Sequence, residues 1–274
     1  MKEMAQPRAW LFVPGDRPNR FAKAIATPEC GVILDLEDAV VPGAKAVARN
    51  NVIAFVRDGE RSGKAVTVRI NPVSTQDGLQ DILALVQAGA APDFILLPKV
   101  EGRAPITLIE ALLSEANMPA GLVALIESAR GVTKTARIAD APRLSALMFG
   151  AADYAADLGQ DASLFDPVHA RAAIVNAAAA NGLAAIDSPY FAIGDDEGLE
   201  QACHAARALG FRAKAAIHPS HIAIIARSFA PGAADLARAR RILELSDGGA
   251  VAIDGKMIDI AILRWARSIV SGPC

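Results

Sequence analysis

Eight short apolar runs recur along the chain, each followed by turn-forming or charged residues, and this repetition limits the folds open to it. The runs are AWLFVP from Ala9, VILDL from Val32, AVTVRI from Ala65, FILLPK from Phe94, LVALIE from Leu122, ALMFG from Ala146, AAID from Ala184 and KAAIHP from Lys214. They are nearly continuous in apolar residues rather than alternating, which is typical of strands in a parallel sheet that is buried on both faces. Their starts lie about 30 residues apart, which leaves room for one helix between consecutive strands.

Helical patterns fill the intervals between these runs. Apolar residues recur at spacings of three and four, and Gly210 stands where a helix cap is expected after 199–209. Eight strand–helix units predict a TIM (β/α)8 barrel over residues 1–230, in preference to an open doubly wound sheet. Residues 231–274 contain the helical stretches Ala233–Leu245 and Ile258–Val270, which are expected to form a C-terminal helical extension.

Composition narrows the classes of partner. Lysine and arginine number 28 against 30 aspartates and glutamates, so a net charge of −2 gives no reason to expect nucleic acid or an anionic membrane surface. Cys30, Cys203 and Cys274 are far apart and form no C-x-x-C pair, which favours reduced thiols in a cytoplasmic protein. We see no apolar signal-peptide region at the start, and no apolar run reaches the ~18–20 residues of a membrane span.

Polar side chains stand at the ends of the predicted strands, where TIM barrels collect their reactive groups. Glu127 and Asp153 follow neighbouring strands, so their carboxylates can point at one position. Mg²⁺ is commonly held by one or two carboxylates together with water and substrate oxygens, so this pair indicates a magnesium site. Arg69 offers a planar fork suited to a substrate carboxylate. An Arg69–Glu127 ion pair that keeps the barrel mouth neutral is the alternative interpretation.

Three acids, Asp35, Glu37 and Asp38, crowd the end of the second predicted strand. Three unpaired carboxylates so close together would repel one another, so we expect at least one to pair with Arg69 or Lys99 or to accept a backbone N–H. We interpret these acids as supporting groups. Lys99 is interpreted as a charge-balancing cation rather than a Schiff-base lysine.

Other polar groups give weaker signals. His218 and His221 stand three residues apart, but no third histidine accompanies them as a metal ligand. Basic and polar residues from Arg17 to Lys23 open a helix, and both a phosphate site and a solvated helix face remain open for them. The chain contains no nucleotide-binding glycine loop, no G-x-S-x-G elbow and no H-E-x-x-H motif.

Ten stretches of the sequence occur in the order of one enzyme family's motifs. They are LFVPGDRPNRFAKA, VILDLEDAV, VRINP, ILLPKVE, ALIES, FGAADY, ARAAIV, AIDSPY, LGFRAKAAIHPSHI and DGKMID. On these stretches, from residue 11 to 259, the chain resembles the citrate lyase β-subunit-like (CitE-like) branch of the HpcH/HpaI aldolase superfamily. The resemblance implies a Mg²⁺-dependent carbon–carbon lyase. Its substrate would be a carboxylate-bearing 3-hydroxyacyl-CoA of the citramalyl-CoA, malyl-CoA or citryl-CoA type, cleaved to a 2-keto acid and acetyl-CoA.

The resemblance also implies roles for individual residues around the reacting centre. Glu127 and Asp153 match the family's metal ligands, with Glu127 also close to the substrate. Arg69 matches the arginine that binds the carboxylate end of the substrate. Asp259, in the GKMID motif, matches the acid/base aspartate that protonates the acetyl enolate.

In relatives the C-terminal segment supplies this aspartate to a neighbouring subunit's site. Residues 231–274 are therefore expected to complete the site of a neighbour in a homo-oligomer, with a trimer favoured. Phe12, Asn19 and Lys23 fall at positions where relatives contact the substrate or its coenzyme A portion.

Two other functions remain open on the sequence. The chain is also compatible with a citrate lyase β subunit that acts on citryl-acyl-carrier protein in a larger complex, and thioester hydrolysis is a related option. A non-catalytic barrel that binds acyl thioesters is the third possibility. The presence together of Arg69, Glu127, Asp153 and Asp259 argues against a non-catalytic barrel.

Overall fold

The computed structural model of the protein describes residues 7–161, 165–245, 251–253 and 256–270. The chain divides into two compact units, residues 1–229 and residues 230–274. None of the helices in the described ranges combines the length and apolar character that a membrane crossing requires.

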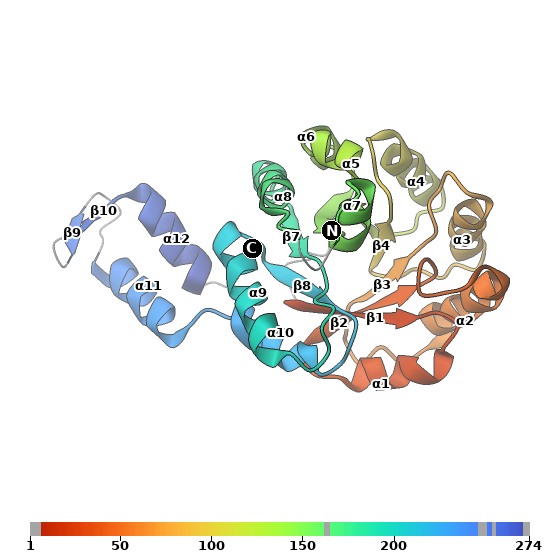
Figure 1. Ribbon diagram of the computed structural model, residues 1–274, viewed down its shortest axis with the longest axis horizontal. Coiled ribbons are helices and arrows are strands. Elements are labelled where there is room, and N and C mark those ends of the chain that lie inside the picture. The colour runs from red at the N-terminus through yellow and green to blue at the C-terminus, as the bar shows by residue number, and fades with distance from the viewer. Residues whose placement is uncertain (1–6, 162–164, 246–250, 254–255, 271–274) are drawn as a thin grey trace. The chain divides into compact units, whose positions relative to one another are not determined.

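The first unit is built on a closed barrel of parallel strands. The strands are β1 (Ala9–Pro14), β2 (Cys30–Asp35), β3 (Val66–Arg69), β4 (Phe94–Leu97), β5 (Gly121–Ile126), β6 (Leu144–Phe149), β7 (Ala184–Asp187) and β8 (Ala213–Ala216). Each strand pairs with the next in sequence, and β8 pairs with β1, so the sheet has no open edge (Figure 1). The predicted TIM barrel is thereby confirmed, and each strand overlaps the apolar run predicted for it.

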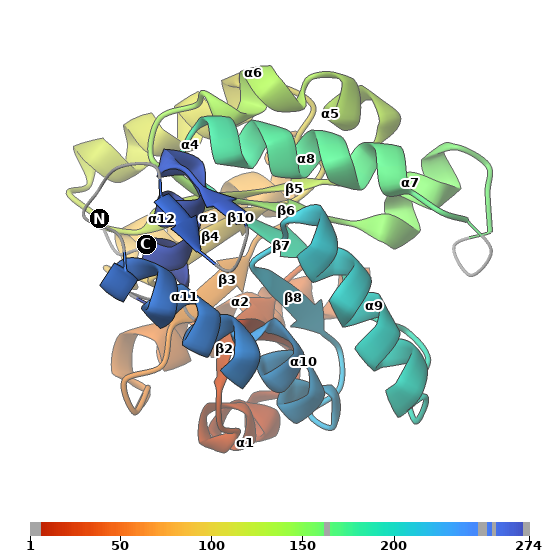
Figure 2. The same cartoon turned by 90° about the vertical axis from the view of Figure 1, so that its left-hand side faces the viewer.

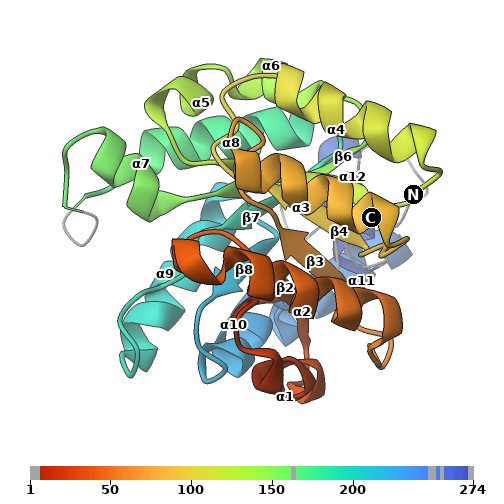
Figure 3. The same cartoon turned by 90° about the vertical axis from the view of Figure 1, so that its right-hand side faces the viewer.

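Helices connect the strands and cover the outside of the barrel. They are α1 (Phe21–Ala26), α2 (Lys45–Asp58), α3 (Gln76–Gln87), α4 (Ala104–Glu115), α5 (Ala129–Thr133), α6 (Thr135–Ala139), α7 (Ala151–Asp157), α8 (Val168–Ala180), α9 (Asp196–Leu209) and α10 (His221–Phe229), with short 3-10 turns η1 (Pro18–Arg20) and η2 (Pro42–Ala44). Figure 2 shows α8, α9 and α10 around β7 and β8, and Figure 3 shows α2, α3 and α4 on another side of the barrel. Helix α9 ends at Gly210, whose φ of 109° is the left-handed conformation expected of a glycine cap.

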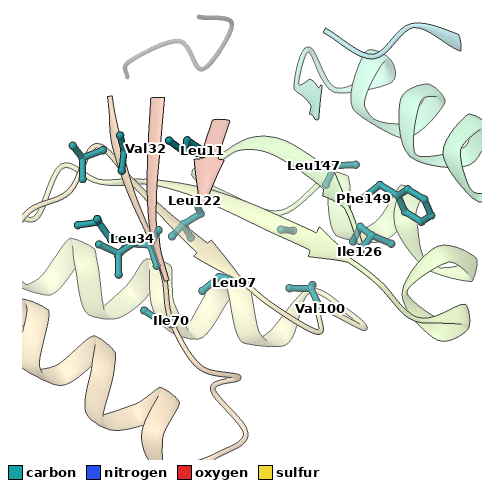
Figure 4. Packing of buried hydrophobic residues seen from close by; sticks show 14 of the residues in the cluster. Leu11, Val32, Leu34, Ile70, Leu97, Val100, Leu122, Ile126, Leu147 and Phe149 are labelled. Carbon is teal, nitrogen blue, oxygen red and sulfur yellow. The ribbon is translucent and has the colours of Figure 1, made fainter. Parts of the chain in front are cut away.

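A large apolar cluster seals the strands against these helices. It includes residues such as Leu34 of β2, Leu97 of β4 and Leu147 of β6, which are buried (Figure 4). Because side chains alternate along a strand, the residues between them face the barrel interior. That interior is filled by a separate cluster that contains Trp10, Ile33, Phe94, Leu96, Val123, Leu125, Ala146, Met148, Ala184, Ile186, Ala213 and Ala215. The Trp10 and Phe94 rings meet edge to face, with centroids 6.1 Å apart.

The same alternation determines what lies at the barrel mouth. Residues two positions beyond an inward-facing residue also face inward. Counting on from Trp10, Ile33 and Leu125 leads to Phe12, Asp35 and Glu127, and Arg69 ends β3 in direct register with Asp35. The interior pattern therefore places these polar side chains at the carboxyl ends of the strands.

The second unit comprises α11 (Ala233–Leu245), β9 (Val251–Ile253), β10 (Lys256–Ile258) and α12 (Ile260–Val270). Strands β9 and β10 pair antiparallel, a hairpin that the sequence analysis did not predict. The predicted second helix begins at Ile260 rather than Ile258, because Ile258 ends β10. A small cluster of Ala239, Ile242, Ile258, Leu263 and Ala266 forms the core of this unit.

The cysteines of the described chain are free thiols. Cys30 and Cys203 are buried and form no disulfide, while Cys274 lies outside the described residues. Burial raises the pKa of the Cys203 thiol to about 11, so this group is protonated and unreactive at neutral pH.

Truncation inside the barrel tests the packing of its interior. Leu96 is fully buried there, so Leu96→Ala should lower the free energy of unfolding by about 2–5 kcal/mol, because the lost contacts leave a cavity. Leu83→Ala is the matched control, since Leu83 on α3 is 46% exposed and its truncation should change stability by about 0.5 kcal/mol or less. Urea denaturation followed by circular dichroism measures both. Equal losses in the two variants would contradict this account of the core.

Candidate active site

A cavity of about 350 Å³ opens at the carboxyl ends of the strands. Its charged lining residues come from the ends of β2, β3 and β5, from the loop after β2 and from α7, which follows β6; they are Asp35, Arg69, Glu127, Asp38 and Asp153. Its apolar lining includes Phe12, Leu125, Met148, Pro189, Phe191 and Ile217. The charged residues thus form one half of the lining, which comes after strands β2 to β6 in the barrel order. Much of the apolar half comes from β1 and from the loops after β7 and β8.

Arg69 lies at the centre of the charged half. Its Nε and one terminal nitrogen each donate to an oxygen of Asp35 at 2.6 Å, a bidentate pair. Asp35 also accepts the backbone N–H groups of Glu37 at 2.9 Å and Ala39 at 3.1 Å, so both of its oxygens are occupied. The phenyl ring of Phe12 lies 4.9 Å from the guanidinium carbon. Asp35 thus orients the guanidinium, and Phe12 covers one of its faces.

Glu37 is buried behind Arg69, between two cations. Its carboxylate lies 2.8 Å from a terminal nitrogen of Arg69 and 3.2 Å from Nζ of Lys99. Burial raises the pKa of Glu37 to about 7, although the Arg69 and Lys99 charges act in the opposite direction. These contacts agree with the expectation that at least one of the three acids after β2 pairs with Arg69 or Lys99. In the described part of the chain, Arg69 forms ion pairs with Asp35, Glu37 and Asp38, so the alternative Arg69–Glu127 ion pair is not found.

Lys99 connects Glu37 to Glu127. Its backbone N–H donates to Oε1 of Glu127 at 2.7 Å, and its φ of 53° lies in the left-handed region, which is uncommon outside glycine. Burial lowers the pKa of Lys99, but the charges of Glu37, Asp38 and Asp153 outweigh that effect and raise it overall. A protonated amine is not nucleophilic, so the geometry favours a charge-balancing role over a Schiff base.

Glu127 and Asp153 face the same cavity, and their environment suits a divalent cation. Glu127 is 4% exposed. Burial, together with the nearby Glu37 and Asp153 charges, raises the pKa of Glu127 to about 8, which marks a negative charge without sufficient compensation. Within the described ranges, no group of three or more His, Cys, Asp or Glu residues could hold a metal. Two carboxylates with the other positions left for water and substrate match the preference of Mg²⁺ rather than that of a closed structural site.

Gly150 makes room for Glu127. A Cβ built on Gly150 would lie 2.6 Å from Cβ of Glu127 and 2.7 Å from its Oε2. The Gly150 N–H donates to the Ile126 carbonyl at 3.0 Å, which holds the two strand ends together. The sequence analysis did not single out this glycine, although its place directly after β6 in the FGAADY motif is the signal that could have found it.

The remaining predicted residues lie elsewhere in the structure. Asn19 in η1 and Lys23 in α1 are exposed and do not line the cavity. Their contact with the substrate or its coenzyme A portion stays a prediction. Asp259, in the second unit, is exposed, and its carboxylate accepts the N–H groups of Ala261 at 2.9 Å and Ile262 at 3.0 Å. It therefore caps α12 within its own unit.

Two lining residues were missed because they come from an irregular loop. Phe191 and Pro189 follow β7, and Phe191 is 54% exposed. An aromatic side chain two residues after a proline, just beyond a strand end, is the signal for them. Asp187, at the end of β7, does not line this cavity, and it pairs with Lys214 at 2.6 Å and Arg171 at 3.2 Å.

Substitution of Gly150 tests whether Glu127 needs its present position. Gly150→Ala should displace the Glu127 carboxylate and weaken Mg²⁺ binding by about 10–100-fold, measured by isothermal titration calorimetry. Gly102→Ala is the control, because a Cβ there meets nothing within 4 Å, and it should bind Mg²⁺ as the unmodified chain does. Unchanged Mg²⁺ affinity in Gly150→Ala would show that Glu127 does not hold the cation.

Comparisons with known proteins point to one family. The family model described as HpcH/HpaI aldolase/citrate lyase matches residues 8–219. The chain is 38% identical over 270 residues to the citrate lyase subunit beta-like protein of Mycobacterium tuberculosis, covering 95% of this chain and 93% of that one. It is 34% identical over 296 residues to the L-malyl-CoA/beta-methylmalyl-CoA lyase of Cereibacter sphaeroides, covering 96% and 93%.

A solved structure is similar over nearly the whole chain. The CitE protein of Mycobacterium tuberculosis, in complex with magnesium, acetoacetate and coenzyme A, is 37% identical, covers 98% of both chains and has a TM-score of 0.83. On the sequence match, the shared barrel and these relatives, the chain belongs to the HpcH/HpaI aldolase/citrate lyase family.

Proposed function

We propose that this chain is a Mg²⁺-dependent carbon–carbon lyase that acts on coenzyme A esters. Its substrate is a carboxylate-bearing 3-hydroxyacyl-CoA, and its products are a 2-keto acid and acetyl-CoA. The observation that carries the proposal is one cavity lined by Glu127, Asp153 and Arg69 in a member of this family. The name of the malyl-CoA lyase relative and the magnesium and coenzyme A in the CitE complex support the cofactor and the thioester.

The residues of the mouth divide the binding work between them. Glu127 and Asp153 would hold Mg²⁺, which when bound supplies Lewis-acid polarisation of the substrate oxygens. Arg69 would bind the substrate carboxylate, and Asp35 holds its guanidinium in a fixed orientation for that purpose. The apolar lining residues, Phe12 and Ile217 among them, exclude water from the acyl group. This exclusion strengthens the charge interactions in the charged half of the cavity.

The coenzyme portion of the substrate is expected outside the cavity. Asn19 and Lys23 are exposed near the start of α1, and a lysine ammonium is a suitable partner for a phosphate group. This role for Asn19 and Lys23 is part of the proposal.

We further propose that the chain forms a homo-oligomer, with a trimer favoured, in which residues 231–274 complete the site of a neighbouring subunit. Asp259 would then protonate the acetyl enolate in trans. Its exposure and its position at the start of α12 leave the carboxylate accessible from the surface of its own unit.

An activity screen with metal removal tests the proposed reaction. Citramalyl-, malyl- and citryl-CoA are supplied to the purified chain, and release of acetyl-CoA is measured with and without EDTA. We expect cleavage of at least one ester, its loss in EDTA, and its return with excess Mg²⁺. The reason is that the lining residues of the cavity include the carboxylates that would hold Mg²⁺ but no group that could replace it as a Lewis acid. EDTA already loaded with Mg²⁺ is the control.

Cleavage of citryl-acyl-carrier protein alone would instead assign the chain to a citrate lyase complex, and failure to bind Mg²⁺ would favour a non-catalytic barrel.

Substitution of Asp259 tests the contribution of the second unit. Asp259→Asn should lower kcat by about 10²–10⁴-fold, because the amide cannot transfer the proton. Asparagine caps a helix as well as aspartate does, so α12 should keep its stability. Coexpression of Asp259→Asn with Glu127→Gln chains should restore part of the activity, since mixed oligomers contain sites with both residues intact. Full turnover of Asp259→Asn, or no recovery in mixed oligomers, would contradict the assignment in trans.

A further inference from the structure

Cleavage of a 3-hydroxyacyl thioester requires two proton transfers. The hydroxyl on the third carbon must lose its proton as its C–O bond becomes a carbonyl, and the released enolate must gain a proton on carbon. The proposed function, on which this inference rests, gives the second transfer to Asp259 and leaves the first without a residue. The acceptor of the hydroxyl proton has to face the cavity and hold a free oxygen lone pair.

Asp35 and Glu37 do not meet these requirements. Both oxygens of Asp35 accept hydrogen bonds from Arg69, and each also accepts one backbone N–H, so the lone pairs of Asp35 are in use. Glu37 does not line the cavity, and it lies between Arg69 at 2.8 Å and Lys99 at 3.2 Å. Proton transfer to either carboxylate would break a buried ion pair, which is costly.

Glu127 and Asp153 are committed to the cation in the proposed function. One oxygen of Glu127 already accepts the Lys99 N–H at 2.7 Å. A carboxylate that binds a divalent cation is a weaker base than a free one, because the cation stabilises its ionised form. Neither residue is then the natural acceptor of the proton.

Asp38 meets both requirements. It lines the same cavity as Arg69, Glu127 and Asp153, and its side chain is 52% exposed. Within the described residues, its side chain makes a single hydrogen bond, accepted from a terminal nitrogen of Arg69 at 3.5 Å. One oxygen is therefore open to the cavity, and solvent has access to the group.

The backbone around Asp38 is held in place, while one oxygen of its side chain stays open to the cavity. Asp35 accepts the N–H of Ala39, and Nζ of Lys45 donates to the carbonyls of Leu36 at 2.8 Å and Glu37 at 2.7 Å. The Val40 N–H donates to the Glu37 carbonyl at 2.9 Å. Residues on both sides of Asp38 are thus fixed, which sets the backbone position from which its carboxylate reaches the cavity.

We propose that Asp38 is the catalytic base that accepts the hydroxyl proton of the substrate. As the O–H bond breaks, its electron pair forms the new carbonyl, and the electrons of the breaking carbon–carbon bond pass to the enolate of the thioester. Asp38 then releases the proton to solvent, while Asp259 delivers one proton to the enolate carbon. One proton leaves and one is added, so the reaction is balanced.

Two reactions with different proton requirements test this assignment. Cleavage needs both proton transfers. Hydrogen–deuterium exchange at the methyl group of acetyl-CoA needs only the proton transfer at carbon. The exchange is measured in D₂O with Mg²⁺ and oxalate, an unreactive analogue of the keto acid. We expect Asp38→Asn to lose kcat for cleavage by about 10²–10⁴-fold while its methyl exchange and its Mg²⁺ affinity stay within threefold of the unmodified chain. Asp58→Asn, an exposed aspartate on α2, is the matched control and should change neither reaction.

A rescue experiment adds an independent readout. Asp38→Ala should regain cleavage when formate is added, because a free carboxylate can occupy the vacated space, and chloride at the same ionic strength should not help. Cleavage by Asp38→Asn within threefold of the unmodified chain would overturn the inference and leave the lyase function standing. Loss of exchange together with cleavage would also overturn it, since Asp38 would then act on the carbon transfer or on binding. If the unmodified chain itself shows neither reaction, the proposed function fails, and this inference fails with it.

Discussion

The buried guanidinium of Arg69 holds the barrel mouth together. Around it the structure gathers carboxylates, with Asp35, Glu37 and Asp38 in contact and Glu127 and Asp153 in the same cavity. Arg69 and Lys99 balance only part of this negative charge. Burial raises the pKa of Glu37 to about 7 against the pull of the two cations, and burial together with the charges of Glu37 and Asp153 raises the pKa of Glu127 to about 8. A divalent cation next to Glu127 would relieve the remaining negative charge, so the electrostatics of the mouth support the proposed metal site.

This concentration of charge depends on polar contacts beneath it. Asn71, just beyond β3, donates to the Leu36 carbonyl at 2.9 Å and to Asp81 at 2.7 Å. Asp81 in turn accepts Nε of Arg49 at 2.6 Å. Together with Lys45, these groups fix the loop after β2 against the loop after β3. The repulsion among the carboxylates is thereby opposed by buried hydrogen bonds to the backbone, which cost more to break than exposed ones.

The sequence predicts some of this architecture and not the rest, for reasons that particular residues make clear. The strands are predictable because a sheet buried on both faces demands continuous apolar runs, and the mouth residues follow because strand ends share one edge of a barrel. The partner of Arg69 among the three acids is not predictable, because it depends on the register that sets Asp35 opposite Arg69. Gly150 and Phe191 were missed because a close approach and an irregular loop leave no periodic signal. The β9–β10 hairpin was missed although an Asp-Gly pair at 254–255, a common hairpin turn, stands between its strands.

The two halves of the cavity arise from different kinds of sequence. The charged half belongs to strand ends whose positions are set by register and by the filled interior of the barrel, so its geometry tolerates little change. Much of the apolar half comes from Pro189, Phe191 and Ile217, which follow strands in loops where insertion and substitution cost less. Chemistry and substrate choice are therefore separable in this fold. The charges proposed to act on the substrate carboxylate and hydroxyl can stay fixed while substitutions in the loops after β7 and β8 alter the apolar half of the cavity.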